Sequence, residues 1–145
     1  MNRYEPAAYA YEKLLMALDS LATGPGDVRE RLLVAHQSFH PLKEAHFPQH
    51  LRKDFRWILE KITKYGPVYD YKGRLDRGSV EETLRRIKNG TGVKIATKLF
   101  RLYHALDAYV RRPDLTSNLS PQTDGRKRKP SPERTSRTRA VGHER

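Results

Sequence analysis

The stretch VKIATKLFRLYHALDAYV, residues 93–110, decides the fold class of this chain. Its apolar residues recur every three or four positions, which is the spacing of one face of an α-helix. We predict a long helix whose buried face carries Val93, Ala96, Leu99, Phe100, Tyr103, Leu106 and Val110. Ile95 and Leu102 fall off that face. A helix that is apolar on more than one side indicates a second covered surface, such as a contact with a partner chain.

The same helical spacing recurs in the preceding part of the chain. Further helices are predicted from Pro6 to about Thr23, from Asp27 to Pro41, from Pro48 to Tyr65 and from Ser79 to Asn89. Residues 66–78 show little periodicity, and we interpret them as a loop. Because the connections are short, the sequence predicts an all-α fold, a compact bundle of four to five antiparallel amphipathic helices.

Particular residues indicate where some of these helices begin and end. Asp27 with Glu30, and Ser79 with Glu82, have the spacing of capping boxes. Gly90 is predicted to end the fourth helix, and Thr91 to cap the fifth. Gly90-Thr91-Gly92 lacks the spacing of a nucleotide-binding loop and follows a helix where a strand is required, so we interpret it as a corner.

The composition changes beyond Arg112. Residues 113–145 are rich in Ser, Thr, Pro and Arg and contain almost no apolar residues. Such a segment buries too little surface to offset the entropy of ordering its backbone. We therefore predict a helical domain over residues 1–112 and a disordered basic tail over residues 113–145.

Charge gives the clearest indication of function. The chain has 29 Lys and Arg against 17 Asp and Glu, a formal net charge of +12. Both the helical part and the tail are basic, which predicts a polyanionic partner, with nucleic acid ahead of anionic lipid. The chain contains no cysteine, so disulfides and thiolate metal sites are excluded.

No apolar run reaches the roughly 18 residues of a membrane span. We expect a noncatalytic, cytoplasmic protein that binds RNA or single-stranded DNA, as an accessory subunit of a larger complex. No cofactor, metal or membrane contact is expected.

The candidate nucleic-acid-binding residues are basic side chains of the last two helices and the tail. They are Arg85, Arg86, Lys88, Thr91, Lys94, Lys98, Arg101, Arg111, Arg112, Arg126, Lys127, Arg128 and Lys129. Lys94, Lys98 and Arg101 form one stripe at helical spacing, which can follow a phosphate backbone. The third helix also carries lysines, but Asp54 and Glu60 lie among them, so its charge is mixed and it contributes no residue to this set.

Nearby aromatic residues add a second kind of contact. Trp57, Tyr69 and Tyr71 lie close in sequence to basic residues and can stack on exposed bases. Stacking of this kind favours single strands over duplexes.

Two other functions remain open. The first is a protein-interaction module, or a homo-oligomer, whose basic surface meets an acidic partner. The second comes from Arg31 and His36, whose spacing resembles the Arg-x4–6-His motif of HEPN-like ribonucleases. This resemblance implies that Arg31 stabilises phosphate charge and His36 transfers protons. Leu32 departs from the family, in which a polar residue commonly follows the arginine.

Four histidines also lie close together, in pairs four residues apart. They are His36, His40, His46 and His50. Two histidines at this spacing on one helix can bind zinc. Pro41 and Pro48 interrupt the register, so only the first pair is expected to share a helix, and we predict no metal site.

Overall fold

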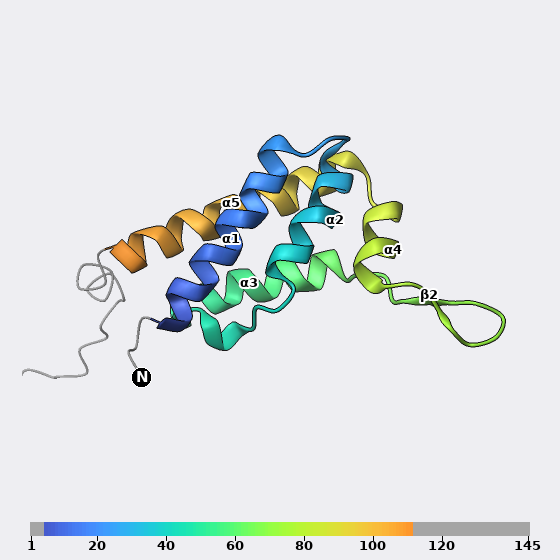
Figure 1. The fold of residues 1–145 in the computed structure, drawn as a ribbon, viewed down its shortest axis with the longest axis horizontal. Coiled ribbons are helices and arrows are strands. Elements are labelled where there is room, and N and C mark those ends of the chain that lie inside the picture. The colour runs from blue at the N-terminus through green and yellow to red at the C-terminus, as the bar shows by residue number, and fades with distance from the viewer. Residues whose placement is uncertain (1–4, 112–145) are drawn as a thin grey trace, which may run out of the picture.

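The fold is an all-α bundle, as predicted, with a small β-hairpin added (Figure 1). The computed structural model describes residues 5–111. Its elements are α1 (Glu5–Thr23), α2 (Val28–Phe39), the 3-10 helix η1 (Glu44–His46), α3 (Gln49–Ile62), β1 (Val68–Tyr69), β2 (Leu75–Arg77), α4 (Ser79–Arg86) and α5 (Asn89–Arg111). The predicted tail, which includes the basic cluster 126–129, lies outside the described residues, and so does the candidate binding residue Arg112.

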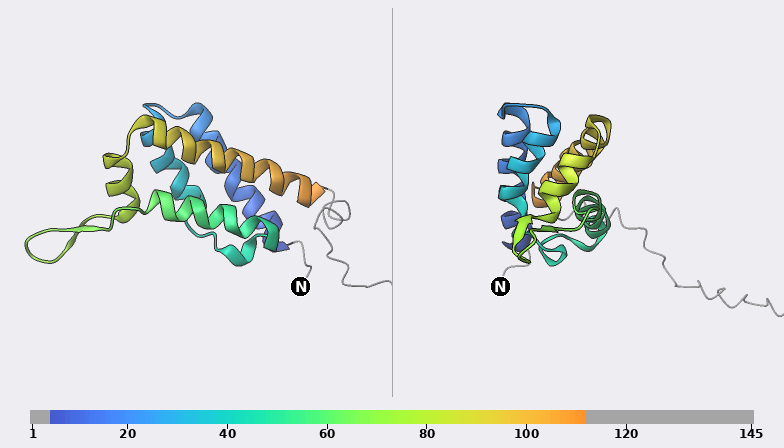
Figure 2. Two further views of the ribbon diagram at one scale, coloured as in Figure 1. Left: turned by 180° about the vertical axis from the view of Figure 1, so that it is seen from behind. Right: turned by 90° about the vertical axis from the view of Figure 1, so that its right-hand side faces the viewer.

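Helix α5 holds the bundle together, because it packs against α1, α2 and α3. Seen from behind, α3 and α5 run side by side, and α4 closes the gap at the end where the hairpin leaves (Figure 2). The core-facing residues of α5 are Gly92, Ile95, Leu99, Leu102 and Leu106, all buried.

The buried face of α5 is therefore not the face that the sequence predicted. Val93 and Phe100 are 53% and 52% exposed, whereas Ile95 and Leu102 are fully covered. Leu99 and Leu106 belong to both patterns, so the prediction identified the correct helix and was wrong about its rotation. The helix carries two adjacent apolar stripes. The bundle buries one of them fully and the predicted one in part, since Ala96, Tyr103 and Val110 are half-buried against the core.

The corner between α4 and α5 also differs from its prediction. Helix α4 is capped by Ile87, and α5 begins at Asn89, so Gly90 and Thr91 lie inside the first turn. The N–H groups of Thr91 and Gly92 both donate to the Lys88 carbonyl, at 3.0 and 3.1 Å. The assignments of Gly90 as the end of α4 and of Thr91 as a cap are therefore wrong.

Gly92 has a packing role in this corner. A Cβ atom built on Gly92 would lie 2.9 Å from Cγ1 of Val28, which is closer than side-chain carbons approach one another. The glycine therefore lets α5 come close to α2.

One of the two predicted capping boxes is confirmed. Oδ1 of Asp27 accepts from the N–H groups of Arg29 and Glu30 at 2.9 and 3.1 Å, and Oε2 of Glu30 accepts from the N–H of Asp27 at 3.0 Å. The Ser79–Glu82 box is wrong, because Gly78 is the residue before α4 and no side chain caps it.

Glu82 instead has a buried role. Its carboxylate accepts from Nε of Arg77 and from Nε of Arg86, both at 2.7 Å, and the residue is only 4% exposed. These two hydrogen bonds hold the pKa of Glu82 below its ordinary value. The ionised form therefore stabilises the fold.

Replacing Glu82 with glutamine is expected to lower the melting temperature at neutral pH, because two guanidinium groups lose their common anion. A carboxyl whose pKa is lowered by folding stabilises above its unfolded pKa, about 4.3 for Glu, and this stabilisation is lost as the pH falls through the folded pKa. The difference in melting temperature between wild type and E82Q should therefore begin to shrink as the pH falls below about 4.3, and should vanish only below the lowered folded pKa. Thermal unfolding followed by circular dichroism at several pH values measures it. E81Q, at an exposed neighbouring glutamate, is the control; equal effects of both substitutions would contradict this role.

The region predicted as a loop contains a β-hairpin. β1 and β2 pair antiparallel, with Val68 opposite Arg77 and Tyr69 opposite Leu75, and the pair projects away from the helices (Figures 1 and 2). Asp70 orders the turn, since its Oδ1 accepts from the N–H groups of Lys72 and Arg74 at 2.8 and 2.9 Å. Strands this short show no alternation in sequence, which is why the hairpin was not predicted.

Candidate nucleic-acid interface

A basic groove runs between α3 and the junction of α4 with α5. It has a volume of about 520 Å³ and is lined by Trp57, Lys61, Lys64, Tyr65, Arg86, Ile87, Lys88, Thr91, Lys94 and Ile95. Half of the lining residues are lysine or arginine, and no aspartate or glutamate is among them. We call this set the basic groove.

A second hollow continues the basic groove along α5. It is lined by Trp57, Val93, Lys94, Thr97, Lys98 and Arg101 and has a volume of about 330 Å³. Trp57 and Lys94 belong to both hollows, so they are continuous. Together they bring the predicted stripe of α5 to the lysines of α3.

Trp57 lies where the two hollows meet. Nζ of Lys61 and Nζ of Lys98 each lie 5.8 Å from the centre of its ring, so cations from two helices approach one indole. A cation over an aromatic face is attracted by the ring quadrupole. Lys98 also forms an ion pair with Asp54 of α3 at 2.9 Å. The partly buried indole is therefore the apolar centre of a positively charged surface.

Tyr65 is a second aromatic residue of the basic groove whose ring is approached by two cations. The guanidinium of Arg86 lies 4.9 Å from its ring centre, and Nζ of Lys64 lies 5.6 Å away. Its backbone N–H donates to Oγ1 of the buried Thr83 at 2.9 Å, which ties the end of α3 to α4. This contact fixes the width of the groove where the hairpin leaves the bundle.

The cations of the groove differ in how much of their charge is free. Arg86 is paired with Glu82, and Lys98 with Asp54. In the described part of the chain, no carboxylate forms a salt bridge with Lys61, Lys64, Lys88, Lys94 or Arg101. These five side chains retain their full charge for an external anion.

The structure brings together some of the predicted binding residues and separates others. Arg86, Lys88, Thr91 and Lys94 line the basic groove, and Lys98 and Arg101 line its extension. Arg85 lies elsewhere, in a hollow that it shares with Asp27, Glu30 and Glu81.

Arg111 is also outside the groove. It forms an ion pair with Asp107 at 2.7 Å, near the end of α5. Its charge is therefore neutralised by a residue of its own helix.

The prediction missed the wall that α3 contributes. Lys61 follows Trp57 at i+4 on one face of α3, and Lys64 follows at i+7, two residues beyond the end of that helix. This spacing was the available signal. The acidic residues of α3 hid it, although Asp54 is neutralised by Lys98 across the helix interface.

Arg31 and His36 occupy different environments in α2. Nη1 of Arg31 donates to the Leu21 carbonyl at 3.3 Å, while the ring of His36 meets the edge of Phe39 at 5.1 Å between centres. Burial, and secondly the charge of His40, lower the pKa of His36. Positions five apart on a helix point about 140° away from each other. The two side chains do not project toward a common point.

The four histidines are dispersed by the fold. The rings of His36 and His40 are 6.1 Å apart, His46 packs on Tyr9, and His50 packs on Tyr109. Within residues 5–111, no group of three or more His, Cys, Asp or Glu is placed to hold a metal ion.

Comparison with protein-family models, curated proteins and solved structures finds no match to this chain. No helix among the described residues is long and apolar enough to cross a membrane.

Proposed function

We propose that this protein binds nucleic acid, RNA or single-stranded DNA, through the basic groove and its extension. The observation that carries the proposal is the groove itself, where cations from α3, α4 and α5 line one hollow together with Trp57 and Tyr65, and no carboxylate lines it. Cations in a row neutralise successive phosphates and release their counterions, which gives salt-dependent affinity for a polyanion.

Exposed aromatic rings favour a single strand over a duplex. Tyr71 is 92% exposed at the turn of the hairpin, and Tyr69 is 59% exposed on β1. Unpaired bases stack on such rings, whereas the bases of a duplex are already stacked on one another. Tyr65 lines the basic groove and lies three residues before β1, so the hairpin begins close to the groove. We infer that a bound strand reaches from the groove to these rings.

Fluorescence titration of the full chain tests this proposal directly, because Trp57 is the one tryptophan in the sequence. Single-stranded RNA, single-stranded DNA and duplex DNA are added over a salt series. We expect the indole signal to change on binding and the logarithm of affinity to fall linearly with the logarithm of salt concentration, by about 0.7 per phosphate contact. No binding to any oligonucleotide at about 50 mM salt would overturn the proposal.

Two controls separate the other functions. Poly-glutamate replaces the oligonucleotide, and binding of equal strength would favour an acidic protein partner. Gel analysis of the RNA after incubation detects cleavage, and cleavage that the H36A substitution abolishes would support the ribonuclease alternative.

A variant with residues 126–129 changed to alanine shows how much affinity the tail adds.

Changing Tyr71 to alanine is expected to weaken binding of single-stranded RNA by about 5- to 100-fold, because stacking of one base on an aromatic ring contributes about 1–3 kcal/mol. Tyr71→Phe keeps the ring and should bind like wild type. Affinity for inorganic polyphosphate, which has no bases, should be the same for all three proteins. Fluorescence titration measures each affinity, and an equal loss for polyphosphate would contradict stacking.

A further inference from the structure

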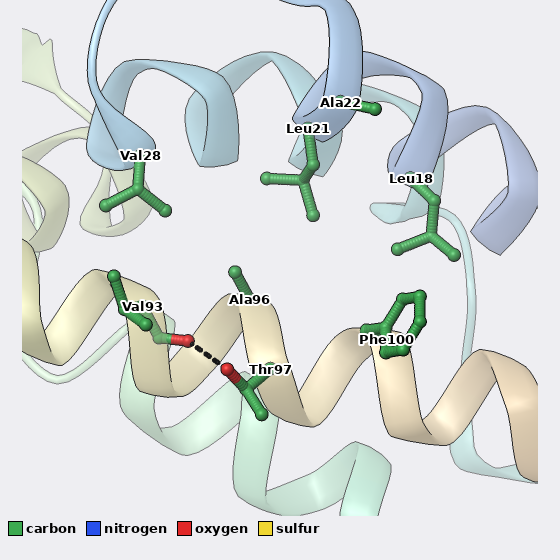
Figure 3. A pocket seen from close by; sticks show the side chains of 8 residues that line it. All are labelled: Leu18, Leu21, Ala22, Val28, Val93, Ala96, Thr97 and Phe100. Atoms are coloured by element: carbon green, nitrogen blue, oxygen red, sulfur yellow. Dashed lines mark hydrogen bonds between the residues drawn. The ribbon is translucent and has the colours of Figure 1, made fainter.

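An apolar groove lies on the other flank of α5, between α1 and the first half of that helix. Leu18 and Leu21 of α1 and Val28 of α2 face Val93, Ala96 and Phe100 across a hollow of about 410 Å³ (Figure 3). This is the second apolar stripe of α5, which the bundle covers only in part. Phe100 and Val93 are each about half exposed, as is Leu15 on the adjoining flank of α1.

The apolar groove has almost no side-chain group that can form a hydrogen bond with water. Its one polar lining side chain is Thr97, whose hydroxyl donates to the Val93 carbonyl at 2.7 Å (Figure 3). An apolar surface without a free polar group is stabilised by removal from water. Exposed apolar grooves are among the places where a ligand or another macromolecule docks.

The two rims of the apolar groove carry opposite charges. On α1, the exposed Glu12 and Asp19 lie on the solvent side of Leu15, at i−3 and i+4. On α5, Lys94 follows Val93 and Arg101 follows Phe100. These two residues also line the extension of the basic groove, so the two surfaces share this edge of α5. None of these four charged groups forms a salt bridge with another of residues 5–111.

We propose that a second copy of this chain covers the apolar groove in a symmetric dimer. In a dimer whose two-fold axis runs along the groove, the same surface faces itself with its two rims exchanged, so the acidic rim of one protomer meets the basic rim of the other. A wholly acidic or wholly basic partner would be repelled by one of the two rims. A second copy of the chain brings a basic rim to the acidic rim, an acidic rim to the basic rim, and an apolar surface to the apolar groove.

Sedimentation velocity of the full chain, freed of nucleic acid, tests the dimer over a roughly hundredfold range of protein concentration. The wild type should move from monomer to dimer as concentration rises. Phe100→Glu places a charge in the groove and should raise the dissociation constant by about 30-fold or more, as for a central interface residue. Val34→Glu is the matched control, because Val34 is 46% exposed on α2 and does not line the groove.

Charge reversal tests the rims separately. The variant with Glu12→Lys and Asp19→Lys should dissociate, since both rims are then basic. Adding Lys94→Glu and Arg101→Glu exchanges the two signs and should restore the dimer.

Four results would each overturn the proposal: a wild type that stays monomeric, an F100E dimer of wild-type strength, equal dissociation of V34E, or charge reversal without effect. None of these measurements uses nucleic acid. The dimer can therefore fail while the proposed function holds, and the reverse is equally possible.

Discussion

A variant with both Lys61→Gln and Lys88→Gln is expected to bind single-stranded RNA about tenfold more weakly, or worse, at roughly 0.1 M salt. The two lysines stand on opposite walls of the basic groove, Lys61 on α3 and Lys88 between α4 and α5. Neither has a carboxylate partner among the described residues, so no ion pair within the bundle is lost with either charge. The plot of log affinity against log salt should become shallower by about 1.4, because two phosphate contacts are removed.

The control for this variant has the same net charge and an intact groove. Lys13→Gln with Lys43→Gln removes two lysines that lie on α1 and before η1, outside both hollows. If affinity depends on the total charge alone, the two double variants will weaken binding equally, and the basic groove is then not the binding surface. Loss confined to the Lys61 and Lys88 variant locates the phosphate contacts between α3 and α5.

The sequence was sufficient for the fold class because most helices carry a single apolar stripe. On α3, Leu51, Phe55, Ile58 and Ile62 are all buried, as their spacing predicts. Helix α5 carries two stripes, and periodicity does not say which of them neighbouring helices will cover. The choice is made by packing, with Gly92 allowing α5 to approach α2 and bringing Ile95 and Leu102 inward.

Half of the candidate site could be predicted in the same way. The stripe of Lys94, Lys98 and Arg101 is visible within one helix, and the structure keeps it on one surface. The wall formed by Lys61 and Lys64 was not predicted, because its relevance depends on α3 lying beside α5. That tertiary arrangement also pairs Asp54 with Lys98, which neutralises one of the two acidic residues that made α3 look mixed in charge.

Replacing Phe55 with alanine should have the largest effect on stability, a loss of about 3–5 kcal/mol. Phe55 is fully buried, and its ring stacks on that of Phe47 with 4.5 Å between centres. The substitution leaves a cavity where α3 meets the segment after η1, and domains of this size lose about 4–8 °C in melting temperature per kcal/mol. Phe55→Leu fills most of the space and should lose much less. Urea unfolding followed by circular dichroism measures both variants, and a loss in F55A no greater than in F55L would contradict this packing role.

The same variant also separates the fold from the proposed binding surface. Positions 55 and 57 of a helix point about 200° apart, so Phe55 faces the core while Trp57 faces the basic groove. Below its melting temperature, F55A should therefore bind RNA with nearly wild-type affinity, while the Lys61 and Lys88 variant loses affinity at nearly wild-type stability. If F55A were folded and yet failed to bind, the groove would depend on the core packing beneath it. The binding surface could then not be treated as a set of side chains carried on a rigid bundle.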